Sequence, residues 1–243
     1  MLFPLFYSGA KMRKLFIAFL VLSSIQVFGQ ATPAAKAPVK RPAAAAPAHP
    51  TATIDTTAGK MTCTLFPDKA PIGVANFIGL AKGTKDWTNP STGRPMHGVS
   101  LYNGTIFHRV IPEFMIQGGD PLGKGTGDPG YKFKNETSPE VGFDRPGRLA
   151  YANAGPDTNG SQFFITEVPY PSLNGGYTIF GQCDDPSVEL VKKIARMPRD
   201  ANDRPENPVK INKITILGAG GTTHTAPAHK PTPKPAPQGT KQQ

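Results

Sequence analysis

Cysteine is scarce in this chain of 243 residues, which contains only two. Two cysteines exclude a small scaffold held together by many disulfides, and they exclude a zinc site with four cysteine ligands. The chain also lacks an obvious membrane span, because spanning a bilayer takes about 20 consecutive apolar residues. Its mostly apolar stretch from Leu15 to Val27 is shorter than that.

Acidic residues are absent from both ends, so the net charge of +10 is unevenly distributed. Residues 1–50 contain six basic residues and residues 219–243 contain three, whereas residues 51–218 contain 18 basic and 17 acidic residues. The middle of the chain is therefore nearly neutral. We expect no nucleic-acid partner for it, because a basic face is the usual mark of such binding.

Glycine and proline, by contrast, are abundant, with 26 and 27 residues. They make up more than a fifth of the chain, against a usual share of roughly 12%. This excludes a helical bundle as the whole structure. The length predicts one or two domains. A hydrophobic content of 38% is low for a uniformly globular chain and high for a fully disordered one, so we expect one folded domain with flexible ends.

The N-terminal segment has the order of a secretory signal peptide. Three basic residues between positions 11 and 14 precede the apolar stretch, and Val27 and Gly29 then stand in the −3/−1 relation of a cleavage site. We therefore expect residues 1–29 to be a signal peptide, cleaved near Gly29, and the protein to be exported, either periplasmic or secreted. An uncleaved segment that anchors the chain in a membrane is the alternative.

Two low-complexity segments flank the middle of the chain. Residues 31–50 contain nine alanines and five prolines, and residues 219–243 are again rich in Pro, Ala and Lys. Such segments bury too little apolar surface to offset the entropy cost of ordering. We expect a linker at 30–50 and a disordered tail at 219–243. A surface-adhesion role, through contact of these segments with an anionic polymer, is the alternative.

Residues 51–218 contain short apolar runs bounded by Gly, Pro and Asn, which predict strands. The expected strands are 52–56, 60–66, 105–110, 114–117, 148–152, 162–166, 178–183 and 209–217. One helix is expected from Pro71 to Gly83, and a second with Asp185 as N-cap and Pro186 as its first residue, ending before Pro198. This set predicts a mainly β domain, a closed barrel with helical lids.

Side chains alternate between the two faces of a strand, so residues two apart share a face. The pairs that share a face are Phe107 and Arg109, Met115 and Gln117, and Gln162 and Phe164. In each pair, apolar bulk stands beside a long polar group. If the strands adjoin, these residues form a binding surface. Ordinary strand residues with scattered apolar exposure are the alternative.

Two long strings resemble the signature of cyclophilin-type peptidyl-prolyl cis-trans isomerases, in their bacterial form. They run from Phe107 to Asp120 and from Ala152 to Ile165. Shorter matches are Gly59 to Phe66, Asn76-Phe77, Phe180-Gly181 and Lys213 to Ile216. The resemblance covers roughly residues 51–218. It implies a closed eight-stranded antiparallel barrel, capped by two α-helices, with the site on its outer face.

The resemblance also implies roles for individual residues. The catalytic residues fall on Arg109, Gln117 and Asn153. The substrate-binding residues fall on Phe114, Met115, Gly125, Ala152, Gln162, Phe164, Leu173 and Tyr177. The chain departs from many members at Ser172, where they have Trp, and at Tyr177, where they have His. We therefore expect weaker binding of the cyclic-peptide inhibitor cyclosporin, with isomerase activity kept.

The implied reaction is rotation about X-Pro bonds, which breaks no bond and requires no nucleophile, metal or cofactor. The chain contains no G-x-S-x-G and no H-E-x-x-H motif that would indicate hydrolysis. We expect proline-containing polypeptides as partners, a role in the folding of exported proteins, and a monomer. A proline-binding module or chaperone without turnover is the alternative.

The two cysteines, Cys63 and Cys183, each lie in a predicted strand. Export to an oxidising compartment would allow a disulfide between them. Two separate buried thiols are the alternative, and the sequence leaves both open.

Overall fold

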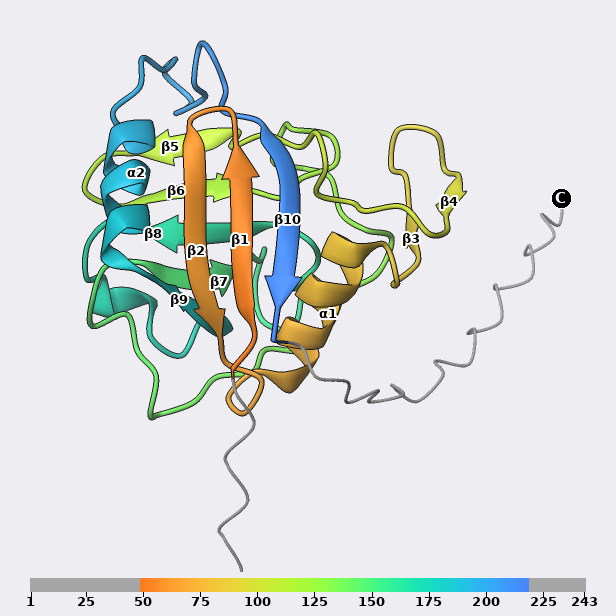
Figure 1. Cartoon of the computed structure of the whole chain (residues 1–243), viewed down its shortest axis with the longest axis horizontal. Coiled ribbons are helices and arrows are strands. Elements are labelled where there is room, and N and C mark those ends of the chain that lie inside the picture. The colour runs from red at the N-terminus through yellow and green to blue at the C-terminus, as the bar shows by residue number, and fades with distance from the viewer. Residues whose placement is uncertain (1–48, 219–243) are drawn as a thin grey trace, which may run out of the picture. The chain divides into compact units, whose positions relative to one another are not determined.

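The computed structural model describes residues 49–218, and its main element is a curved eight-stranded antiparallel sheet (Figure 1). The strand order is β10-β1-β2-β9-β7-β8-β6-β5. The strands are β1 (Thr51–Thr56), β2 (Gly59–Leu65), β5 (Arg109–Ile111), β6 (Met115–Gly118), β7 (Arg148–Tyr151), β8 (Phe163–Thr166), β9 (Ile179–Cys183) and β10 (Ile211–Leu217). In Figure 1, β10, β1 and β2 lie in front of β5 to β8. All eight predicted strands are present, within a few residues of the expected ends.

The prediction of a closed barrel is corrected by the pairing within residues 49–218. The end strands β10 and β5 do not pair with each other as strands. The segment before β5 contacts the start of β10 through a bridge between Ile106 and Lys210 and through a bond from the Phe107 N–H to the Val209 carbonyl (3.0 Å). Two more backbone bonds involve Ile211, whose N–H donates to the Thr105 carbonyl and whose carbonyl accepts from the Gly104 N–H, both at 2.8 Å. The reason is the short β5, which has three residues, so the chain before it contacts the other end through irregular backbone.

The core lies between the two layers of the sheet and is rich in aromatic residues. Phe77, from helix α1 (Pro71–Lys82), contacts Tyr102, Phe163 and Phe180 with ring centroids 5.1 to 5.7 Å apart. All four side chains are fully buried. Burial of such large rings dominates the stability of a core. The helix thereby covers one side of the sheet, where Figure 1 shows it beside the lower half of β10.

Both predicted helices are present, with one correction at an end. Helix α1 begins at Pro71 and ends at Lys82, and it is capped by Gly83, whose φ of 73° is the left-handed conformation that glycine adopts easily. Helix α2 (Asp185–Ala195) has Asp184 as its N-cap, and the Asp184 side chain accepts a hydrogen bond from the Ser187 N–H. Asp185, which was predicted to be the N-cap, is instead the first residue of the helix, and Pro186 is the second. This shift is possible because a proline ring fits at the second helical position as well as at the first.

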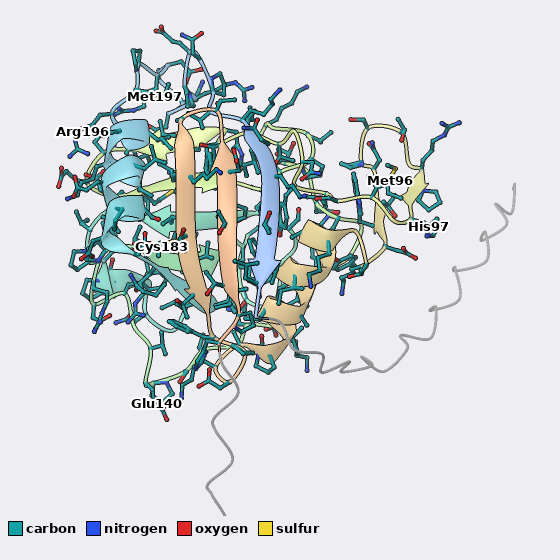
Figure 2. The ribbon with its side chains drawn as sticks, viewed as in Figure 1. Met96, His97, Glu140, Cys183, Arg196 and Met197 are labelled. Carbon is teal, nitrogen blue, oxygen red and sulfur yellow. A yellow bond between two sulfur atoms is a disulfide. The ribbon has the colours of Figure 1, made fainter. Side chains whose placement is uncertain are left out.

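The region between α1 and β5 contains a hairpin that the sequence did not predict. Strands β3 (Trp87–Thr88) and β4 (Pro95–Met96) form a separate two-stranded sheet. Figure 2 shows Met96 and His97 on this projection, away from the main sheet. Trp87 is buried at its base, and its Nε1 donates to the Val99 carbonyl at 2.9 Å. Two-residue strands are too short to produce a periodic pattern.

Cys63 on β2 and Cys183 on β9 lie directly opposite each other and form a disulfide. The structure thus decides between the two alternatives in favour of the bond. Figure 2 labels Cys183 next to β2, and both cysteines are buried. The bond therefore links β2, in the front layer of the sheet, to β9, its neighbour in the strand order.

The expected signal peptide, nearly all of the linker and the expected tail lie outside the described residues. In residues 49–218, neither helix has the length and apolar character needed to cross a membrane.

Candidate active site

A cavity of about 830 Å³ opens on the outer face of the sheet, next to β5, β6 and β8. It combines apolar and charged side chains. The lining residues are His108, Arg109, Phe114, Met115, Gln117, Lys124, Gly125, Ala152, Asn153, Phe164, Leu173, Tyr177, Asp200, Asn202 and Arg204. The structure therefore brings the residues predicted to catalyse or bind substrate together in this cavity, except Gln162, which is not among the residues that line it.

The strand register explains why the central residues meet. Arg109 pairs with Gln117 across β5 and β6, and Gln117 pairs with Phe164 across β6 and β8. Directly opposite residues on adjacent strands point to the same face. One row across three strands thus presents a cation, an amide and an aromatic ring. The three strands therefore adjoin, which was the condition for a shared binding surface.

Phe107 does not share the face of Arg109, contrary to the prediction. It is fully buried in the main core, in contact with Phe163. His108, which strand alternation would place on the opposite face from Arg109, lines the cavity together with it. The reason is that β5 begins only at Arg109, so the alternation of an extended strand does not apply to the two residues before it.

The apolar part of the cavity rests on a second, smaller core. Met115 and Phe164 are 2% and 4% exposed and pack with Phe143, which stacks on Phe164 at 5.8 Å between ring centroids. Tyr177 meets the Phe164 ring edge-on at 5.5 Å. Phe114 and Leu173, which are partly buried, pack against the same cluster. The result is a packed apolar slot along one part of the cavity.

A chain of side-chain amides runs beside this slot. The Nη1 atom of Arg109 lies 3.5 Å from Oε1 of Gln117, and Nε2 of Gln117 donates to Oε1 of Gln162 at 2.9 Å. Nε2 of Gln162 donates in turn to the carbonyls of Gly125 and Gly127, at 3.1 and 2.9 Å. Gln162, predicted to bind substrate, therefore holds Gln117 and the loop and does not itself line the cavity.

Ala152 and Asn153 form another part of the cavity wall. The Ala152 N–H donates to the Gln162 carbonyl at 3.0 Å, which continues the sheet pairing past the end of β7. Nδ2 of Asn153 donates to the Gly176 carbonyl at 3.0 Å, and its Oδ1 accepts from the Gly155 N–H at 3.3 Å. These bonds fix the orientation of the Asn153 side chain at the edge of the cavity.

The glycine-rich loop at 121–127, which borders the cavity, is organised by a buried carboxylate. Asp120 is fully buried, and its side chain accepts from the N–H groups of Leu122, Lys124 and Gly125 at 2.7, 2.9 and 2.5 Å. Burial alone would raise the pKa of Asp120, but the backbone donors outweigh it, so the pKa is lowered. A side chain at Gly127 would collide with this carboxylate, since a Cβ there would lie 1.9 Å from Oδ1.

His108 lies at the inner wall of the cavity, and neither of its ring nitrogens has a hydrogen-bond partner among the described residues. Burial lowers its pKa, because it disfavours the charged imidazolium, and the nearby Asp120 only partly opposes this effect. The ring is therefore neutral at pH 7.

The lowered pKa of His108 predicts a pH dependence of stability. The unfolded chain binds a proton near the ordinary pKa of about 6.5, whereas folded His108 does so only at lower pH. The unfolded state thus holds more protons in that window, so the free energy of unfolding should fall as pH drops below about 6.5. Urea unfolding of the wild type and His108→Gln should show this decrease reduced in the variant. An identical pH slope in both proteins would contradict the assignment.

The turn that carries Phe114 is held by a buried acid. Glu167 is 1% exposed, accepts from the Glu113 N–H at 3.0 Å, and donates its own N–H to the Phe114 carbonyl at 2.8 Å. Arg196, at the end of α2 in Figure 2, pairs with both Glu113 and Glu167. A buried charge needs such a partner. Helix α2 thereby fixes one wall of the slot.

Sequence reasoning missed the segment after α2 that completes the cavity. Asp200, Asn202 and Arg204 line it, and Nη1 of Arg204 donates to the Gly123 carbonyl at 2.5 Å. No periodic pattern marks this segment. Its position depends on backbone contacts with β5, such as the bond from the Val110 N–H to the Asp203 carbonyl at 2.9 Å.

Comparison with known proteins identifies the family. The model of the cyclophilin type peptidyl-prolyl cis-trans isomerase/CLD family matches residues 51–216. The chain is 53% identical over 167 residues to peptidyl-prolyl cis-trans isomerase A of Mycobacterium tuberculosis, which covers 68% of this chain and 91% of that protein. It is 50% identical to peptidyl-prolyl cis-trans isomerase B of Streptomyces anulatus, over 68% of this chain and 95% of that one.

A solved structure shows the same fold. The crystal structure of a cyclophilin type peptidyl-prolyl cis-trans isomerase from Cryptosporidium parvum has a TM-score of 0.59 and 36% identity. The match covers 70% of this chain and 98% of that chain. The family model, the relatives and the cavity described above agree, and the chain therefore belongs to the cyclophilin-type peptidyl-prolyl cis-trans isomerases.

Proposed function

We propose that this isomerase is exported and that it rotates X-Pro bonds without covalent chemistry, using Arg109 to stabilise the twisted amide. The observation that carries the proposal is the combination of an apolar slot and a guanidinium on one face of the sheet. A further structure of the Cryptosporidium parvum protein was solved in the presence of the dipeptide Ala-Pro. A proline side chain would bind in the slot formed by Phe114, Met115, Phe164 and Leu173.

The chemistry needs no nucleophile. Amide resonance sets a rotation barrier of roughly 18–20 kcal/mol, and uncatalysed turnover takes tens to hundreds of seconds. In the twisted state the amide loses conjugation, so its nitrogen becomes a better acceptor. A donor placed there stabilises the twisted state more than the planar one, which is differential binding of the transition state. Arg109 supplies this donor, and the residues that line the cavity include no Ser, Thr or Cys.

The remaining rate enhancement comes from holding the substrate. One charge-assisted hydrogen bond contributes about 1.5–3 kcal/mol, which is less than the 4–5.5 kcal/mol needed for roughly 10³- to 10⁴-fold acceleration. The apolar slot fixes the proline ring, while Asn153 and Gln117 hold the flanking backbone, so that only the chain beyond the bond rotates.

Export is tested by fractionating the cells that make the protein and sequencing the N-terminus of the mature chain. The signal-peptide order of residues 1–29 predicts a mature chain that begins near Gln30, outside the cytoplasm. A chain that keeps residues 1–29 and stays in the cytoplasmic fraction would contradict export and leave the isomerase activity untouched.

Ser172 carries a prediction about inhibitor binding. It is exposed in the short helix η1 (Pro171–Leu173), next to Leu173 at the cavity. Ser172→Trp adds apolar surface to this rim and should tighten cyclosporin binding by about tenfold, measured by calorimetry. The matched control is Ser91→Trp on the distant β3–β4 projection, which should leave the affinity unchanged. Tight binding by the wild-type chain would contradict the prediction.

A further inference from the structure

An acidic side chain from the segment after α2 faces Arg109. Oδ2 of Asp203 lies 3.8 Å from Nε of Arg109, and Oδ1 of Asp203 lies 3.3 Å from Nε of Arg199. The Asp203 and Arg109 side chains are 32% and 43% exposed. On the opposite side of the guanidinium, Nη1 faces Gln117. Arg109 is therefore contacted from two sides, by an amide on β6 and by a carboxylate from a segment remote in sequence.

The backbone places Asp203 independently of its side-chain contacts. Its φ of 61° is in the left-handed region, which Asp tolerates better than most residues. Its N–H donates to the Asp200 carbonyl at 3.1 Å, and its carbonyl accepts from the Val110 N–H at 2.9 Å. The Asp200 side chain accepts from the N–H groups of Asn202 and Arg204, at 2.8 and 3.0 Å, and closes the turn.

This arrangement has a consequence for the orientation of Arg109. An arginine side chain has many rotamers, and an exposed one samples them freely unless contacts restrict it. The carboxylate attracts the Nε side of the guanidinium, and Gln117 restricts the Nη1 side. The other Nη donors are then left to face the cavity. Because Asp203 also contacts Arg199, its charge is shared and does not cancel that of Arg109.

We propose that Asp203 is a positioning residue for Arg109, which holds the guanidinium in the orientation used for catalysis. The proposal rests on the proposed role of Arg109. Since exposed ion pairs contribute little, the expected effect is modest. Asp203→Ala should lower kcat three- to fivefold and leave KM nearly unchanged, and Asp203→Asn should keep part of the activity because its amide oxygen still accepts a hydrogen bond.

The decisive test is a double-mutant cycle on the full chain, with turnover of a proline peptide followed by exchange NMR. The variants are Arg109→Ala, Asp203→Ala and the pair. If Asp203 acts through Arg109, Asp203→Ala lowers kcat three- to fivefold when Arg109 is present. The same substitution then leaves kcat unchanged in the Arg109→Ala background. The control is Glu206→Gln, which removes one negative charge from an exposed acid in the same segment and should leave kcat unchanged.

A second readout separates positioning from a merely structural role. The Arg109 Nε resonance should shift in Asp203→Asn, while the Val110 amide, bonded to the Asp203 carbonyl, keeps its position. An equal loss of kcat in both backgrounds, no loss in either, or a displaced Val110 amide would overturn the inference. If Arg109→Ala itself leaves kcat unchanged, the proposed role of Arg109 fails first, and that result is distinguishable from a failure of Asp203 alone.

Discussion

Replacing Arg109 by alanine is expected to lower kcat by about 10- to 100-fold. The magnitude follows from a charge-assisted hydrogen bond of about 1.5–3 kcal/mol that forms fully only in the twisted state of the amide. Since the apolar slot binds the proline ring without Arg109, the Kd of a proline peptide should change less than about threefold. Exchange NMR gives kcat and a peptide titration gives Kd.

The control for this variant is Arg145→Ala, which removes an exposed arginine outside the cavity and should leave both constants unchanged. Arg109→Lys should fall between the wild type and alanine, because it keeps the charge and loses the planar fork of donors. A Kd that weakens in step with kcat would show that Arg109 binds the ground state, and the electrostatic account of catalysis would then be wrong.

The second large effect is on stability. Replacing both disulfide partners, Cys63→Ala with Cys183→Ala, should lower the free energy of unfolding by about 4–5 kcal/mol. The bond closes a loop with a sequence separation of 120 residues, and removing it restores the conformational freedom of the unfolded chain. Denaturant unfolding in non-reducing buffer measures the difference.

Catalysis should survive this change, because neither cysteine lines the cavity. The folded double variant should keep the kcat of the wild type at a temperature well below its melting point. A thiol titration of the unfolded, unreduced wild type is the direct check on the bond and should find no reactive thiol. Two thiols per chain would contradict the disulfide, and a stability loss below about 1 kcal/mol would contradict its structural importance.

Local patterns in the sequence predicted most of the fold. The eight strands follow from short apolar runs with clear Gly and Pro boundaries, and α1 follows from Pro71 and Gly83. The prediction was wrong where tertiary contacts override local pattern. Phe107 turns into the core because β5 begins two residues later, and the two ends of the sheet meet through irregular backbone instead of strand pairing.

The candidate site was predicted through the two signature strings, which contain most of the residues around the slot. The two strings could not show that segments remote from them in the sequence also line the cavity. Asp200 and Arg204 lie about 90 residues after Arg109 in the chain, and backbone bonds to β5 bring their segment to the cavity. For the same reason, the sequence alone could not decide whether the two cysteines form a disulfide. The register of β2 against β9 decides whether they meet.

The most direct test of the central claim is exchange NMR on a small Ala-Pro-Phe peptide with catalytic amounts of the full chain. The account predicts exchange between the cis and trans signals on a timescale of about ten milliseconds, against tens to hundreds of seconds without protein. Binding of the peptide without any such exchange would contradict it, and would show that the slot and Arg109 serve proline recognition without turnover.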